Sequence, residues 1–198
     1  YVWYAVIITI NALVAILSQP YWGKISDKYG DRSIMIITGI MTVFIPLAWM
    51  FASNIPEVIF VQIYDGFIYG GWTLVVFNFL IGACPQEKRC SYVANHAFFV
   101  GLAAVLGTLA GGFLAEYFGA GILVLGFTGL SIIFLLSFLV RLGSLPLLHH
   151  VQSNYTKTEH EPDERFAFKV LVVEPTRFMT HYVGYVYNFD WIKEKIYM

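Results

Sequence analysis

Charged side chains are scarce in this sequence, and most scarce in its first 142 residues. Charged residues make up 13% of the 198 and hydrophobic residues 58%, whereas a soluble domain has about 25% charged and about 45–50% apolar residues. Only 12 charged residues fall within positions 1–142, which is too few to solvate the surface of a globule of that size. The composition therefore argues against a water-soluble enzyme.

Other features that would indicate a soluble function are also missing. The sequence has no basic face that could neutralise phosphates, so no nucleic-acid partner is expected. Its two cysteines, Cys84 and Cys90, are too few for a disulfide-rich secreted domain and are not spaced like zinc ligands. Neither a phosphate-binding loop nor a His-Glu-x-x-His helix occurs. We expect no metal, no cofactor and no catalytic residue, and the class that remains is an integral membrane protein.

Five long apolar runs stand where a soluble chain would carry charges. About 20 helical residues cross the roughly 30 Å of membrane hydrocarbon, and because lipid cannot satisfy backbone polar groups, such spans must be helices. The predicted fold class is all-α, a polytopic transmembrane helix bundle. Its five predicted spans are residues 1–19, 33–52, 58–83, 91–115 and 120–142. Residues 1–142 would form the transmembrane domain and residues 143–198 a C-terminal tail.

Basic residues in the predicted turns indicate the orientation of this bundle. The six basic residues before position 143 lie in the first and third turns or at the end of the last span, and the second and fourth turns have none. Basic turns of membrane proteins stay on the cytoplasmic side. We therefore expect a multi-pass protein of the cell (plasma or inner) membrane, with its basic turns and its tail in the cytoplasm.

The first predicted turn carries the most specific motif of the sequence. Gly23 would let the two helix ends approach, and Gly30 can adopt a positive φ where the chain reverses. Asp27 is placed to accept hydrogen bonds from helix N-terminal amides or from an Arg of a neighbouring turn. Lys28 and Arg32 would hold the turn at the inner membrane surface by their charge.

With these residues the sequence resembles the major facilitator superfamily, whose signature between the second and third helices of each six-helix half reads G-x-x-x-D-(R/K)-x-G-(R/K)-(R/K). Asp31 departs from it, since the family usually has Arg or Lys there. The C-terminal copy of the signature often lacks that basic residue, so the resemblance implies helices eight to twelve followed by the tail. Helices two to six are the alternative. The resemblance covers residues 1 to 142, and because the chain starts inside a helix, we expect a fragment whose N-terminal half is missing.

Glycines recur in the fourth predicted span, in the segment GLAAVLGTLAGG. This segment resembles the glycine-rich fifth or eleventh helix of the family. Gly107 and Gly111 form a small-xxx-small pair, which allows two helices to touch closely in lipid. We interpret Gly107, Gly111 and Gly112 as helix-packing residues, and we expect the same of Gly66 and Gly70 in the third span.

Asp65 is the only carboxylate inside a predicted span. An ionisable group in hydrocarbon costs from about 3 to above 10 kcal/mol and therefore usually faces a cavity or a partner. Gln62, Tyr69 and Trp72 share its helical face by spacing. Asp65 is either a protonation or solute-binding site, or an acid kept neutral by burial or paired with a helix outside this chain. Asn11 in the first span either lines the same cavity or makes an interhelical hydrogen bond.

The resemblance implies a secondary active transporter that moves a small solute by alternating access between two halves. We expect ion or proton coupling, with the signature turn acting as a conformational latch. The expected partners are the lipid bilayer, a small-molecule solute and the missing N-terminal half. A membrane enzyme would need several acids or histidines at one depth, which the spans do not offer. The alternative function is a non-transporting membrane scaffold or a subunit of an integral-membrane complex.

Overall fold

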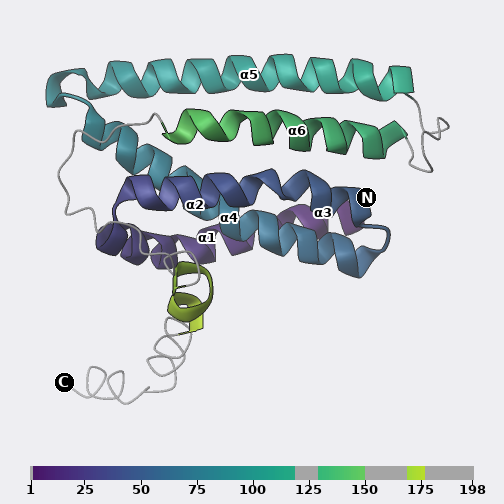
Figure 1. The fold of residues 1–198 in the computed structure, drawn as a ribbon, viewed down its shortest axis with the longest axis horizontal. Helices are drawn as coiled ribbons and strands as arrows, with labels where there is room; N and C mark the ends of the chain where they lie inside the picture. Colours follow the sequence, from purple (N-terminus) through teal and green to yellow (C-terminus); the bar gives the residue numbers. More distant parts are fainter. Residues whose placement is uncertain (1, 119–128, 150–168, 177–198) are drawn as a thin grey trace. The chain divides into compact units, whose positions relative to one another are not determined.

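The computed structural model describes residues 2–118, 129–149 and 169–176, and these ranges contain helices and turns but no strand (Figure 1). The chain divides into two compact units, residues 1–159 and 160–198. The helices of the first unit are α1 (Val2–Tyr29), α2 (Asp31–Val43), α3 (Ile45–Phe51), α4 (Ile55–Ala83), the short 3-10 helix η1 (Gln86–Lys88), α5 (Arg89–Phe118) and α6 (Gly129–His149).

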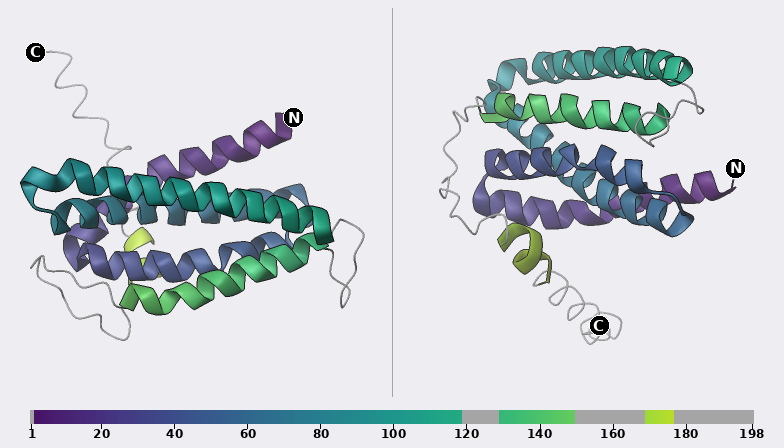
Figure 2. Two further views of the ribbon diagram at one scale, coloured as in Figure 1. Left: turned by 90° about the horizontal axis from the view of Figure 1, so that it is seen from above. Right: turned by 45° about the vertical axis from the view of Figure 1, so that its right-hand side comes forward.

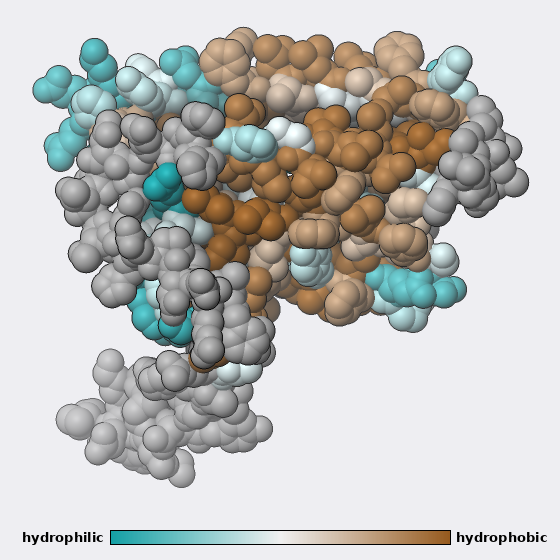
Figure 3. All heavy atoms as spheres, in the orientation of Figure 1, coloured by the Kyte–Doolittle hydropathy of each residue, from teal (hydrophilic) through white to brown (hydrophobic). Residues whose placement is uncertain are grey.

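Five helical spans within the described ranges are long and apolar enough to cross a membrane. Helices α2 and α3 together form the second span, and α1, α4, α5 with η1, and α6 form the others. Apolar side chains cover the middle of the helices, and hydrophilic residues gather near their ends (Figure 3). Large apolar side chains such as Phe60 and Phe113 are about 70% exposed, which a soluble monomer avoids. The predicted all-α transmembrane fold class is confirmed for the described part of the chain.

Two helices run past the ends that we predicted for them. α1 continues through Pro20 to Tyr29, although the predicted span ends at residue 19. A proline removes one backbone hydrogen bond, and transmembrane helices tolerate it when neighbouring helices compensate. α6 continues to His149, past the predicted end at residue 142, so that Arg141 lies inside the helix and does not close it.

The second span is broken near its middle. Phe44 separates α2 from α3, and Pro46 stands in the first turn of α3. In an unbroken helix the N–H of residue 46 would donate to the carbonyl of Thr42, but proline has no N–H. The Thr42 carbonyl therefore lacks the donor that an unbroken helix would give it.

The first unit is organised around α4. α1 packs along one side of α4 and α2 along another, while α6 contacts α2 and α3 (Figures 1 and 2). Trp22, Ile34, Ile68 and Val75 are fully buried in these contacts. α5 lies beside α6, and it has no buried residue within the described part of the chain. The core is therefore formed by α1, α2 and α4.

In the second unit the structure describes only residues 169–176, which include a π-helical turn, η2 (Lys169–Val173). The rest of the predicted tail, residues 150–168 and 177–198, and the predicted start of the last span at residue 120 lie outside the described residues.

Candidate functional site

A polar cluster lies between α1 and α4 at the position of the predicted intramembrane acid. The Asn11 side-chain amide donates to Oδ2 of Asp65 and to Oε1 of Gln62, at 3.1 Å each, and to the Gln62 backbone carbonyl at 3.3 Å. Gln62 is only 9% exposed. Asn11 therefore makes an interhelical hydrogen bond, and the structure brings together three of the five predicted cavity residues.

Glycines on α4 allow this close approach. A Cβ added at Gly66 would lie 2.5 Å from the Asn11 backbone carbonyl oxygen, and one at Gly70 would lie 2.5 Å from that of Ala15. An added Cβ at Gly70 would also overlap the Ser18 hydroxyl. These contacts confirm that Gly66 and Gly70 are helix-packing residues. They also place the Asn11 amide within reach of Asp65.

The other two predicted cavity residues, Tyr69 and Trp72, are placed differently from this cluster. The Trp72 ring lies 3.3 Å from the position that a Cβ of Gly39 in α2 would take. Tyr69 is 54% exposed. The predicted face of α4 is thus divided: Gln62 and Asp65 meet α1, whereas Trp72 packs toward α2.

Arg141 makes a contact between helices that the sequence did not predict. Its Nη1 donates a 3.0 Å hydrogen bond to the carbonyl oxygen of Thr42 at the α2–α3 break. At the same break the Tyr64 hydroxyl donates to the Met41 carbonyl at 3.2 Å. The prediction that Arg141 closes the last helix is wrong, because α6 continues to His149. The apolar residues that follow it, LGSLPLL, were the signal that the helix continues.

The chain reversal that contains the signature residues is shorter than the predicted turn of about ten residues. The helix runs through residue 29, and Gly30 alone separates α1 from α2, with φ of 86°. The positive φ expected at Gly30 is confirmed. A Cβ at Gly23 would meet no described atom within 4 Å, so the close approach expected there is not found. Asp31, which departs from the family pattern, accepts a hydrogen bond from the Ser26 hydroxyl across the turn.

The charged signature residues lie at this same end of α1 and α2. Asp27 and Lys28 are exposed and Arg32 is half-buried. The Lys28 ammonium lies 4.9 Å from the centroid of the Tyr29 ring, which is within the range of a cation–π interaction. Their role as a latch stays a prediction.

The glycines predicted to pack on α5 face open space in the described part of the chain. A Cβ added at Gly107, Gly111 or Gly112 would meet no atom within 4 Å. Their packing role stays a prediction, and it requires a partner other than the described helices.

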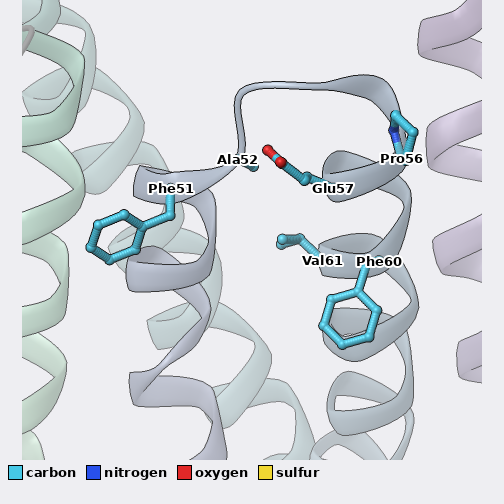
Figure 4. Close-up of a pocket in the computed structure, with 6 residues that line it drawn as sticks. All are labelled: Phe51, Ala52, Pro56, Glu57, Phe60 and Val61. Atoms are coloured by element: carbon cyan, nitrogen blue, oxygen red, sulfur yellow. The ribbon is translucent and has the colours of Figure 1, made fainter.

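A recess of about 470 Å³ lies at the α3–α4 turn, lined by Phe51, Ala52, Pro56, Glu57, Phe60 and Val61 (Figure 4). The Glu57 carboxylate points toward the turn, where it accepts from the backbone N–H groups of Ser53 at 2.6 Å and Asn54 at 3.2 Å. Together with Asn54 it forms a capping box at the start of α4. Because the acid is engaged in capping, the recess is an apolar one.

Metal and thiol chemistry find no support among the described residues. They contain no group of three or more His, Cys, Asp or Glu side chains that could hold a metal ion. Cys84 is buried and Cys90 exposed, and both are free thiols.

Five apolar helices with a carboxylate hydrogen-bonded between two of them define a polytopic membrane protein with a polar site at membrane depth. The chain belongs to the Major Facilitator Superfamily, whose sequence profile matches residues 3–190. This is a family of membrane transporters and not of enzymes. The match reaches beyond residue 142, the predicted end of the resemblance, and so includes much of the predicted tail.

Three relatives illustrate the similarity. The chain is 30% identical over 112 residues to the multi-drug resistance efflux pump PmrA of Streptococcus pneumoniae, covering 57% of this chain and 28% of that protein. It is 26% identical over 148 residues to the multidrug resistance protein MdtG of Salmonella choleraesuis, covering 73% and 36%. It is 25% identical over 103 residues to the staphyloferrin B transporter of Staphylococcus aureus, covering 52% and 25%. The chain thus spans about a quarter to a third of these relatives, and no solved structure matches it significantly.

Proposed function

We propose that this chain is the C-terminal part, helices eight to twelve, of a secondary active transporter that moves a small organic solute by alternating access. The family membership and the names of the relatives support transport of drug-like or siderophore-like molecules. The fraction of the relatives that the chain covers supports its being part of a longer transporter. Helices two to six are the other placement, which the upstream sequence would distinguish.

The observation that carries this proposal is the Asp65 carboxylate between α1 and α4. Asp65 is ten residues from the start of α4, which corresponds to about 15 Å of helix. A carboxylate at that depth is costly unless it has partners, and Asn11 is such a partner. Asp65 can therefore exist as a hydrogen-bonded carboxylate or as a neutral acid. Switching between these two forms would couple the movement of the solute to the movement of a proton.

The remaining roles follow from this assignment. Asp27, Lys28 and Arg32 would latch the cytoplasmic ends of α1 and α2 in one of the access states, with Gly30 as the pivot between them. The missing N-terminal half would complete the cavity, and the open glycines of α5 would pack against helices outside this chain. The 143–198 segment would lie in the cytoplasm.

The test of the function uses the full-length polypeptide that contains this chain, reconstituted in sealed vesicles. Wild-type protein should take up solute in response to a pH gradient, and Asp65→Asn should abolish that response while preserving the hydrogen bond to Asn11. Asp65→Glu should retain part of it. Glu116→Gln, at the end of α5, is the control and should behave as wild type. If Asp65→Asn leaves uptake and its pH dependence unchanged, the coupling role is wrong. If wild-type vesicles move no solute at all, the scaffold alternative is favoured.

The orientation has its own test. Single cysteines would replace Ser53 in the second turn and Lys88 in the third, in a background with Cys84→Ser and Cys90→Ser. A membrane-impermeant thiol reagent should label position 53 only from outside intact cells and position 88 only after the cytoplasmic face is opened. Labelling of both positions from one face would contradict the proposed topology.

A further inference from the structure

The two halves of the second span are held in different ways. α2 packs along α4, and its buried residues are distributed from Ile34 to Val43. In α3 the buried residues are Ile45 and Pro46, both next to the break, and Phe51 at the far end is 68% exposed. α2 is therefore anchored in the core, whereas the burial of α3 is confined to its first two residues.

The backbone between the two halves departs from a regular α-helix. The Phe44 N–H donates to the Met41 carbonyl at 3.2 Å, three residues back instead of the four of an α-helix. A tightened turn of this kind in the middle of a helix often marks a hinge. Pro46 also removes the donor for the Thr42 carbonyl. The break is thus a point at which the span can bend.

Two neighbouring helices donate hydrogen bonds to the carbonyls at this break. The Tyr64 hydroxyl of α4 donates to the Met41 carbonyl at 3.2 Å, and Nη1 of Arg141 in α6 donates to the Thr42 carbonyl at 3.0 Å. Neighbouring helices that satisfy freed backbone groups allow a membrane helix to bend in lipid. Tyr64 and Arg141 therefore stabilise the bend without closing the backbone ladder.

One face of α6 contacts both halves of the broken span. These contacts run in antiparallel order, Phe134 with Trp49, Phe138 with Phe44, Arg141 with Thr42 and Leu148 with the position of a Cβ at Gly39. Positions 134, 138, 141 and 148 follow i, i+4, i+7 and i+14 spacing, which places them on one helical face. The Trp49 and Phe134 rings are stacked, with centroids 6.4 Å apart and planes at 15°. This stacked pair holds the outer part of α3 against α6.

α3 also has an apolar recess on the side of α4. The recess of about 470 Å³ lies between the end of α3 and the first turns of α4. Val61 points from α4 toward α3, whereas the Phe51 ring points away from α4 (Figure 4). Because the Glu57 carboxylate is engaged in capping, an apolar helix could enter the recess without burying an unpaired acid. The recess is therefore a second apolar surface on which α3 can pack.

We propose that the second span is hinged at Phe44, with α2 as its fixed half and α3 as a moving half that exchanges between α6 and the recess on α4. The inference rests on the proposed function and adds to it the element that moves at the outer end of the transporter. In the observed form Trp49 stacks on Phe134. In the second form α3 fills the recess and the two rings separate. Arg141 and Tyr64 keep the carbonyls at the break paired in both forms and are positioning residues.

The distance test uses the full-length polypeptide in lipid nanodiscs, in a background without native cysteines. Spin labels at Ser53→Cys, in the turn after α3, and Leu130→Cys, in the first turn of α6, report the distance between α3 and α6. Labels at the exposed positions Ile40→Cys in α2 and Leu147→Cys in α6 form the control pair. Double electron–electron resonance should give two distances for the first pair and one for the control pair. A single distance for both pairs would overturn the hinge.

Two variants test what controls the exchange. Trp49→Leu removes the stacking on Phe134 and should shift the first label pair toward its longer distance. Pro46→Ala restores the N–H that donates to the Thr42 carbonyl, and one distance should remain, because proline disfavours a regular helix interior by about a hundredfold relative to alanine. Pro46→Ala should also lose most of its solute transport in vesicles. Two distances in unchanged proportions in both variants would overturn the proposal.

Melting temperatures in detergent test the role of Arg141 at the break. Arg141→Leu should lower the melting temperature more in the wild type than in the Pro46→Ala background, where the alanine N–H pairs with the Thr42 carbonyl, so the two substitutions should be non-additive. Val140→Ala, at the adjacent exposed position of α6, is the control and should have equal effects in both backgrounds. Equal shifts for Arg141→Leu in both backgrounds would overturn its role as a donor at the break.

These measurements separate the hinge from the proposed function, because the distances are recorded without solute. Two distances in a wild type that moves no solute would support the hinge and overturn the transporter assignment. Two distances in the wild type together with full transport by Pro46→Ala would overturn the role of the hinge in transport. A single distance in a wild type that does transport solute would overturn the hinge and leave the proposed function in place.

Discussion

The indole ring of Trp22 in α1 occupies the place that a side chain would take at Gly71 in α4. A Cβ added at Gly71 would lie 2.6 Å from two ring atoms of Trp22. From this position the indole Nε1 donates to the Phe67 carbonyl at 2.8 Å, and the Trp22 and Phe67 ring centroids are 5.0 Å apart. The pair shows how α1 and α4 are joined: by the absence of a side chain on one helix and a large buried ring on the other.

This contact predicts that Gly71→Ala destabilises the protein. The Trp22 ring would have to move, and overpacking of this kind costs about 1–3 kcal/mol, more than alanine gains over glycine in a helix interior, about 1 kcal/mol. Denaturant unfolding in detergent micelles measures the difference. Gly143→Ala in α6 is the matched control, because an added Cβ there meets no described atom within 4 Å. A Gly71→Ala variant as stable as Gly143→Ala would contradict the observed packing.

The turn between α1 and α2 predicts a second stability effect. Gly30 has φ of 86° and ψ of 147°, a conformation that is essentially restricted to glycine and that costs a residue with a side chain about 1–3 kcal/mol. Gly30→Ala should therefore lower the free energy of unfolding by about that amount. Gly143→Ala, in open space within α6, is the control and should not destabilise. Loss of stability in the control alone, or in neither variant, would argue against the strained turn.

Asp27→Asn tests the latch. The substitution removes one negative charge and keeps the size of the side chain, so it should slow solute transport by the full-length polypeptide without lowering its amount in the membrane. Transport rate and membrane yield would be measured on the same cells. Glu87→Gln, an exposed acid in η1, serves as the control. If Asp27→Asn reduces insertion instead, the segment is a folding element and not a latch.

Asp65 shows which part of the site could be predicted from the sequence. Its isolation in a long apolar run predicted a partner, and the structure supplies Asn11 across the α1–α4 interface. The pairing with Gln62 could be predicted from helical spacing, whereas the direction of Trp72 could not. Residues on one face of a helix meet different neighbours along its length. Which neighbour each one meets depends on how the helices pack.

Arg141 shows what could not be predicted from the sequence. It was interpreted as the residue that closes the last helix, but α6 continues to His149. Its partner, the Thr42 carbonyl, lies 99 residues away in the sequence, at the break between α2 and α3 where Pro46 stands.

The number of spans, their helical state and the reversal at Gly30 were determined by the sequence alone. The reason is local, because lipid leaves each apolar run no backbone hydrogen-bond partner except its own next turn. Only the tertiary structure decided that α1 lies against α4 through Gly66, Gly70 and Gly71, and that Arg141 reaches Thr42. In lipid, hydrophobicity does not select which helices become neighbours, because the surroundings are as apolar as the helices. The close fit of side chains against glycines selects the neighbours instead.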